Sequence, residues 1–162
     1  TMPVRQLHTC ATWWTINEKS IRASGILRAD LPGALHGAEH ASIGLLPLFA
    51  TCDRWDLGGL STAAHPDTGR ATVIVHDAIS GGSGCAERGF SAGPAWMQAT
   101  LETLESCPCR TGCPRCVQSP KCGNNNEPLS KSGAILLLRT LTESITEAHP
   151  RDLLWRSTRP SS

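Results

Sequence analysis

The chain has 162 residues, eight of them cysteines, and a formal net charge of +1 at pH 7. This length suits one domain with a real core and argues against two full domains. The balanced charge excludes a chain that is basic throughout, so any surface for nucleic acid must be local. No run of about 18 apolar residues occurs, and the first residues do not form a charged segment followed by an apolar one, so neither a membrane span nor a signal peptide is expected.

The first third of the chain predicts one strand and one buried helix. Leu7 to Ile16 is rich in Thr, Trp and apolar residues, which is typical of a strand, whereas residues 17–31 are polar and irregular. Gly33 to Phe49 is almost entirely apolar or small. This segment predicts a buried helix of three to four turns that ends or kinks near Pro47.

The predicted buried helix carries the pattern H-x-x-E-H at His36, Glu39 and His40. On a helix the two histidines lie four residues apart on one face, as in inverted zinc metalloproteases. A zinc-dependent hydrolase is therefore one alternative, although no third ligand follows at a recognisable distance. The other alternative is that these polar groups hydrogen-bond within the fold, to Asp53 or Asp56.

The middle of the chain predicts a tight loop, a strand and a glycine-rich turn. Residues 52–60 are rich in turn formers and are expected to hold an Arg–Asp ion pair, and residues 61–70 form a polar loop. Ala71 to His76 is β-branched and is the clearest strand. The turn Ser80–Gly84 then leads into a helix from Cys85 towards Phe90, where the backbone either contacts an anion or simply packs closely. No Lys-Ser/Thr follows the glycines, which disfavours a P-loop.

Two further helices complete the predicted fold. Pro94 begins a helix that runs to about Ser106. Residues 129–147 carry an apolar stripe at helical spacing. We therefore expect an α/β (α+β) fold in which three or four helices pack on a small mixed sheet, with a four-cysteine zinc loop. Residues 1–149 would form this domain, and residues 150–162 a basic, flexible tail.

Five of the eight cysteines fall between Cys107 and Cys122, and they predict a zinc site. Cys113 and Cys116 have the spacing of a zinc knuckle, and Cys107 and Cys109 form a tighter pair that can supply two more ligands. Cys122 could replace Cys107 or Cys109, and a disulfide cluster is the other possibility. Scattered remaining cysteines suit a reducing compartment, the cytoplasm, where clustered thiols bind metal. Four thiolates leave no open position, so this Zn²⁺ would be structural.

Three cations lie within the cysteine loop, Arg110, Arg115 and Lys121, and Lys131 lies just beyond it. A zinc ion with four thiolates carries a net charge of about −2, which these cations offset in part. We expect the same side chains to contact DNA phosphates or to dock on a neighbouring domain.

Several segments together resemble one family. They are Gly33–His40, Cys52–Gly59, His76–Gly84, Cys107–Cys116, Ser119–Asn124 and Asn126–Lys131, in that order. The set resembles the C-terminal zinc-binding domain of the bacterial mitomycin-repair helicases, which are superfamily 2 DEAD/DEAH-box enzymes. The cysteine loop with its Gly-Cys-Pro core and the Asp-Arg-Trp-Asp segment are its specific parts.

The resemblance implies a parent protein that binds single-stranded DNA, hydrolyses ATP and unwinds duplexes in the 3′ to 5′ direction during DNA repair. It also implies zinc bound through Cys107, Cys109, Cys113 and Cys116. This chain itself has no Walker A motif and no DEAD or DEAH tetrad, so it is not expected to be the enzyme. The motor lobes would be partners in the same polypeptide, with no membrane involved. A purely structural or protein-docking module is the remaining alternative.

Overall fold

The computed structural model describes residues 6–147 and 156–158. The elements in chain order are β1 (Ala11–Ile16), α1 (Glu18–Ser24), α2 (Leu31–Leu45), η1 (Leu46–Leu48), η2 (Arg54–Asp56), β2 (Leu57–Thr62), β3 (Ala71–Asp77), α3 (Cys85–Ser106), α4 (Lys131–Glu147) and β4 (Arg156–Thr158). Within these ranges, no helix is both long enough and apolar enough to cross a membrane.

The strands form one sheet in the order β2-β3-β1-β4, and every pair in the described part of the chain is antiparallel. The predicted α+β class is confirmed, but the sheet is antiparallel rather than mixed. For β2 and β3 the reason is that they are consecutive and joined by a short loop, whereas a parallel pair would need a longer crossover. Alternate residues of β1, among them Trp14 and Ile16, are buried on one face of the sheet.

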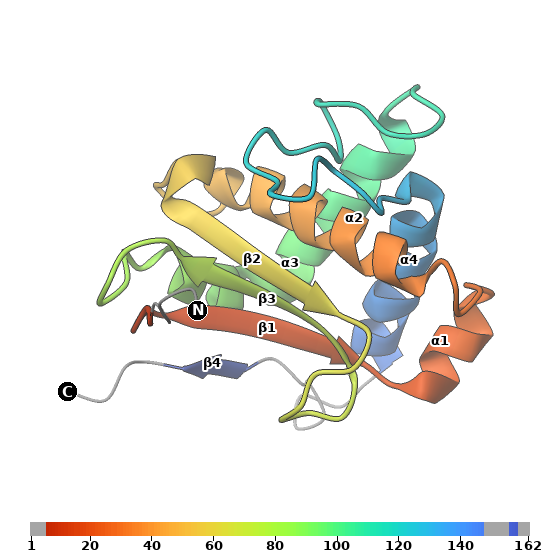
Figure 1. Ribbon diagram of the computed structural model, residues 1–162, viewed down its shortest axis with the longest axis horizontal. Helices are drawn as coiled ribbons and strands as arrows, with labels where there is room; N and C mark the ends of the chain where they lie inside the picture. Colours follow the sequence, from red (N-terminus) through yellow and green to blue (C-terminus); the bar gives the residue numbers. More distant parts are fainter. Residues whose placement is uncertain (1–5, 148–155, 159–162) are drawn as a thin grey trace, which may run out of the picture.

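Helices cover that buried face of the sheet (Figure 1). Helix α2 packs on β2 and β3, α3 packs on β1 and β3, and α4 packs against α2 and α3. The predicted buried helix is confirmed as α2, with Pro47 in the 3-10 turn that follows. The apolar stripe predicted for residues 129–147 is also confirmed in α4, since Leu137 and Leu138 are fully buried in the core.

Two elements depart from the sequence prediction. Residues 17–31 were expected to be irregular, yet they contain α1, whose N-cap Asn17 accepts a hydrogen bond from the backbone N–H of Ser20. Residues 57–62 were expected to be a turn and a loop, yet they form β2. Gly58 and Gly59 lower the strand propensity of that segment, and pairing with β3 overrides it.

The two predicted helices on either side of Gly93 join into α3. Gly93 has φ 36° and ψ −108°, which are not helical values, and Pro94 follows it inside the helix. Glycine tolerates this backbone conformation because it has no Cβ, and proline suits the first turn of the helical segment that restarts there. The helical segment after the kink ends at Ser106 and leads directly into the cysteine loop.

The glycine-rich turn before α3 binds a carboxylate of the chain itself. Asp77 is fully buried, and its carboxylate accepts the backbone N–H groups of Ser83 at 2.7 Å, Gly84 at 2.9 Å and Ala86 at 2.8 Å. These are the N–H groups that an external anion would use. Of the two alternatives for this turn, the structure favours close packing of strand and helix, with Asp77 as an internal anion.

The loop before β2 is held by backbone hydrogen bonds rather than by the expected Arg–Asp ion pair. Asp53 accepts the N–H of Trp55, and Asp56 accepts the N–H of Asp53, which makes a reciprocal capping box. No ion pair of Arg54 occurs among the described residues. The short aspartates reach nearby backbone donors more readily than they reach a guanidinium.

The predicted tail, residues 150–162, lies outside the described residues except for Arg156–Thr158. These three residues pair with β1 as the edge strand β4. The boundary at residues 149 and 150 stays a prediction.

Candidate metal centre

The cysteine loop joins α3 to α4 and lies over α2 (Figure 1). The backbone N–H of Ser130 donates to the carbonyl of Gly33 at 3.0 Å. One helical turn later, a Cβ on Gly37 would lie 2.9 Å from the Ser130 carbonyl oxygen and 3.3 Å from a methyl of Val117. A glycine at residue 37 therefore lets the end of the loop rest directly on the helix.

The structure brings together the four cysteines that the spacing predicted as ligands, with all four sulfur atoms within 4.8 Å of one another. Zinc–sulfur bonds of about 2.3 Å in a tetrahedron place neighbouring sulfurs about 3.8 Å apart. The Sγ–Sγ distances are 3.6 Å for Cys107–Cys109, 3.6 Å for Cys107–Cys113, 3.5 Å for Cys109–Cys116 and 3.8 Å for Cys113–Cys116. The donor set and its spacing fit a tetrahedral zinc ion, and no disulfide joins these cysteines.

The backbone carbonyl of Cys113 organises the turn between Cys113 and Cys116. That oxygen faces the backbone N–H groups of Cys116, Val117 and Gln118, each at 3.1 Å. Gly112 precedes the turn with φ 118°, a conformation that side chains rarely adopt. The turn points both thiols of the knuckle at one spot, as a metal site needs.

Lys131, which the sequence places just beyond the loop, contacts the cluster directly. It is 6% exposed, and its Nζ donates to the carbonyls of Cys107 at 2.7 Å and Cys109 at 2.6 Å. The same ammonium lies 3.3 Å from Cys109 Sγ. Lys131 is the first residue of α4, so its side chain connects that helix to the cysteine loop. A buried cation here offsets the negative charge of a zinc–thiolate centre.

The thiols of the cluster differ in acidity. Partial burial is the largest influence on Cys109 and opposes ionisation, but hydrogen bonds from Cys116, Cys107 and Lys131 outweigh it and lower its pKa to about 6. Burial is also the largest influence on Cys116, and there it raises the pKa of the thiol. One thiolate is therefore available near neutral pH, and a metal would displace the remaining protons.

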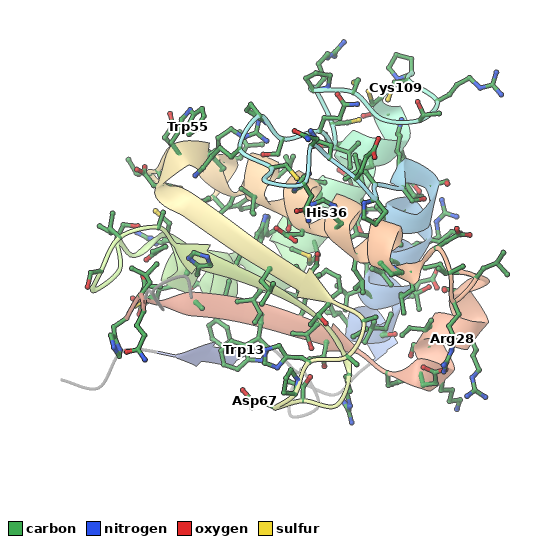
Figure 2. All side chains as sticks on the ribbon, viewed as in Figure 1. Trp13, Arg28, His36, Trp55, Asp67 and Cys109 are labelled. Atoms are coloured by element: carbon green, nitrogen blue, oxygen red, sulfur yellow. The ribbon has the colours of Figure 1, made fainter. Side chains whose placement is uncertain are left out.

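Cys122 lies apart from this cluster. Its Sγ is 3.4 Å from His36 Nε2, and it groups with His36 and His40 on α2. The alternative in which Cys122 replaces Cys107 or Cys109 therefore does not match the geometry. Figure 2 shows Cys109 on the outer part of the loop and His36 on α2, in separate places. The sequence showed the H-x-x-E-H pattern but not its third member.

The two histidines of the pattern on α2 hydrogen-bond to backbone rather than to Asp53 or Asp56. His36 Nδ1 pairs with the Pro128 carbonyl at 2.7 Å, and His40 Nδ1 pairs with the Val117 carbonyl at 3.1 Å. Burial, the largest influence, lowers the pKa of His40 to about 4, so its imidazole is neutral. The pattern therefore ties α2 to the loop that follows the cysteine cluster.

Glu39 lies between the two histidines in the sequence, and its side chain is buried. It lines a cavity of about 440 Å³ between α2, β2 and the loop that contains Cys122. Burial raises its pKa, while a hydrogen bond with Ser61 and the nearby His36 and His76 act in the opposite direction. A carboxyl in this setting favours its protonated form more than an exposed one does.

The three predicted DNA-contacting cations differ in their surroundings. Arg110 and Arg115 are exposed on the cysteine loop, and neither takes part in an ion pair with another described residue. Lys121 Nζ instead donates to two carbonyls of the Asp-Arg-Trp-Asp segment, those of Arg54 at 3.4 Å and Trp55 at 3.0 Å, and to that of Leu57, the first residue of β2, at 2.8 Å. The Lys121 ammonium therefore makes hydrogen bonds within the domain. A role in DNA binding for all three cations remains a prediction.

Comparison with known proteins identifies the family. The model of the MrfA Zn-binding domain matches residues 38–117, which include all four clustered cysteines. A protein of Methanocaldococcus jannaschii, MJ1572.1, is 34% identical over 110 residues, which are 66% of this chain and 98% of that protein. The chain belongs to the MrfA zinc-binding domain family.

Two helicases contain a segment similar to this MrfA zinc-binding domain. The ATP-dependent helicase HRQ1 of Saccharomyces cerevisiae is 34% identical over 122 residues, which are 69% of this chain and 11% of HRQ1. A crystal structure of the DUF1998 helicase MrfA bound to DNA superimposes with a TM-score of 0.63 at 26% identity, over 87% of this chain and 18% of that one. The chain thus spans a small part of each helicase but nearly all of MJ1572.1.

Proposed function

We propose that this MrfA zinc-binding domain is an accessory module of an ATP-dependent DNA helicase, in which a zinc-bound loop presents cations to DNA. The observation that carries the proposal is the arrangement of four sulfurs at zinc-compatible distances in a loop with two exposed arginines. The similarity to a helicase solved with DNA supports it. ATP hydrolysis and translocation would come from motor lobes in the same polypeptide, and the setting would be DNA repair in the cytoplasm.

The physical basis is the rigidity that a metal gives to a short loop. Unfolded thiols bind zinc poorly, so the binding free energy, on the order of 10 kcal/mol, stabilises the folded loop. Arg110 directly follows Cys109 and Arg115 directly precedes Cys116, so zinc would fix the backbone from which they project. Two guanidinium groups on a fixed frame suit the phosphate oxygens of a nucleic acid.

Lys121 has a different role in this proposal. Its ammonium donates to two carbonyls of the η2 turn and to the carbonyl of Leu57 at the start of β2, and it lies 5.3 Å from the centre of the Trp55 ring. We propose that it stabilises the surface of the module, while Arg110 and Arg115 make the phosphate contacts. The single-stranded form of DNA is the expected ligand.

The salt dependence of single-stranded DNA binding tests the arginines. Each phosphate contact contributes a slope of about −0.7 to the plot of log K against log salt. Arg110→Ala with Arg115→Ala should therefore flatten the slope by about 1.4, as measured by fluorescence anisotropy over a series of KCl concentrations. Arg70→Ala with Arg88→Ala is the matched control, because both arginines are exposed and lie away from the cysteine loop.

An unchanged slope in the Arg110/Arg115 double variant would contradict the DNA-contact proposal. It would favour a purely structural or protein-docking module instead. Equal flattening in the control pair would show that binding follows net charge rather than this loop.

A further inference from the structure

A second group of potential metal ligands lies on α2 and the loop that covers it. His36, His40 and Cys122 each offer one ligand atom, and these atoms lie within 4.8 Å of one another. The His36 Nε2 to Cys122 Sγ distance of 3.4 Å matches the spacing of two ligands about 2.0 and 2.3 Å from one tetrahedral zinc ion. Cys122 thus adds a third potential ligand to the two histidines of the sequence pattern.

Both histidine rings are oriented as metal-binding histidines are. Each Nδ1 faces a backbone carbonyl, that of Pro128 for His36 and that of Val117 for His40. A carbonyl can only accept a hydrogen bond, so each Nδ1 carries the proton and each Nε2 keeps a free lone pair. A carbonyl partner on the other ring nitrogen is the usual support of a metal-bound imidazole.

The loop around Cys122 is built to hold its sulfur in place. The backbone N–H of Asn126 points at Cys122 Sγ at 3.3 Å, an interaction that stabilises a thiolate. The Asn126 side chain accepts from the N–H of Ser119 at 2.7 Å and donates to its carbonyl at 3.1 Å. Asn126 has φ 60°, which asparagine tolerates better than most residues do. These bonds close the loop and fix Cys122 over α2.

The group lines a cavity of about 440 Å³, and the walls of that cavity include Glu39, His76 and Gly59. A Cβ on Gly59 would lie 2.6 Å from Glu39 Oε1, so glycine at this residue of β2 keeps the space around the carboxyl open. A metal held by the three side chains would have protein on one side and this cavity on the other.

We propose that His36 Nε2, His40 Nε2 and Cys122 Sγ form a second Zn²⁺ site, with a fourth coordination position open to the cavity. Imidazole and thiolate are the ligand types that zinc prefers, and three protein ligands with an exchangeable fourth position differ in kind from the closed four-cysteine centre. His36 and Cys122 lie outside the segment matched by the family model, residues 38–117, so the family assignment does not imply this site.

The count of zinc ions per chain tests the site. The metal-depleted chain would be titrated with Zn²⁺ under reducing conditions, with bound metal measured by mass spectrometry of the elements. We expect about two zinc ions per wild-type chain and about one in Cys122→Ser or His40→Gln. Cys10→Ser and His65→Gln are the matched controls, because neither residue belongs to a ligand group in the described part of the chain, and both should retain about two.

Cobalt provides a readout that does not depend on any variant folding well. In the wild-type chain, the first equivalent of Co²⁺ should give the spectrum of a four-sulfur site, and a second equivalent should add bands of a site with one sulfur and nitrogen ligands. Saturation at one equivalent, with an unchanged spectrum thereafter, would overturn the proposal. The three side chains would then form a hydrogen-bonded group in which the Cys122 thiol donates to His36 Nε2.

Discussion

The four-cysteine loop and the His36–His40–Cys122 group show two ways in which one chain can assemble metal ligands. The first takes all four sulfurs from ten consecutive residues, Cys107 to Cys116. The second joins a helix to a loop 86 residues further along the chain. The four cysteines can bind a metal once a short segment of the chain has folded. The His36–His40–Cys122 group exists only after α2 and the loop that contains Cys122 have packed together. Ligands that are close in sequence therefore suit a metal that helps the chain to fold, and ligands that are far apart in sequence suit a site that depends on the completed fold.

The comparison predicts its largest effect at the four-cysteine loop. Cys113→Ser should abolish zinc binding there and cost on the order of 10 kcal/mol of apparent stability, since the metal supplies folding free energy. Chemical denaturation with and without a chelator measures this loss, and low soluble expression should accompany it. Cys122→Ser is the matched cysteine change and should leave the fold intact. Wild-type solubility of the Cys113 variant, with no bound zinc, would refute a structural role for the metal.

An intermediate effect is expected at Lys131, which ties α4 to the cysteine loop. Lys131→Met keeps the length and the apolar stem but removes the ammonium that contacts Cys109 Sγ and two carbonyls. Zinc affinity at the four-cysteine site should fall 10- to 100-fold, as for other partners of metal ligands. Competition with a chromogenic chelator measures the affinity. The exposed Lys19→Met is the control, and equal affinity in both variants would remove Lys131 from the site.

The smallest effect is expected at Asn126, which anchors the loop around Cys122. Asn126→Gly permits the positive φ and keeps the backbone N–H, but it removes both hydrogen bonds to Ser119. Zinc affinity at the second site should fall about tenfold while the four-cysteine site is unaffected. Asn125→Gly is the control, because Asn125 also has a positive φ of 53°. A loss at both sites would show that the two regions are not independent.

The difference between the two regions also explains how much the sequence could reveal. The cysteine spacing, the buried helix α2 and the β-branched strand β3 carry local signals, and the structure confirms each of these groupings and elements. Nothing local links Cys122 to His36, because that contact depends on the tertiary path of the loop. Strand order was likewise hidden, since β1 pairs with β3 rather than with the next strand.

Two elements were missed for local reasons. Helix α1 is short and polar, but Asn17 as its N-cap and Gly25 with φ 79° at its C-terminal end are readable signals. Strand β2 contains Gly58 and Gly59, and its pairing with β3 outweighs their low propensity. The partners of Lys121 were also unreadable, because its three carbonyl acceptors lie more than 60 residues away.

X-ray absorption at the zinc edge of the Cys122→Ser chain tests the central claim most directly, since that variant retains only the four-cysteine site. The structure predicts four sulfur neighbours at about 2.3 Å and no nitrogen or oxygen in the first coordination sphere. A first sphere with nitrogen or oxygen ligands, or no bound zinc at all, would contradict the account.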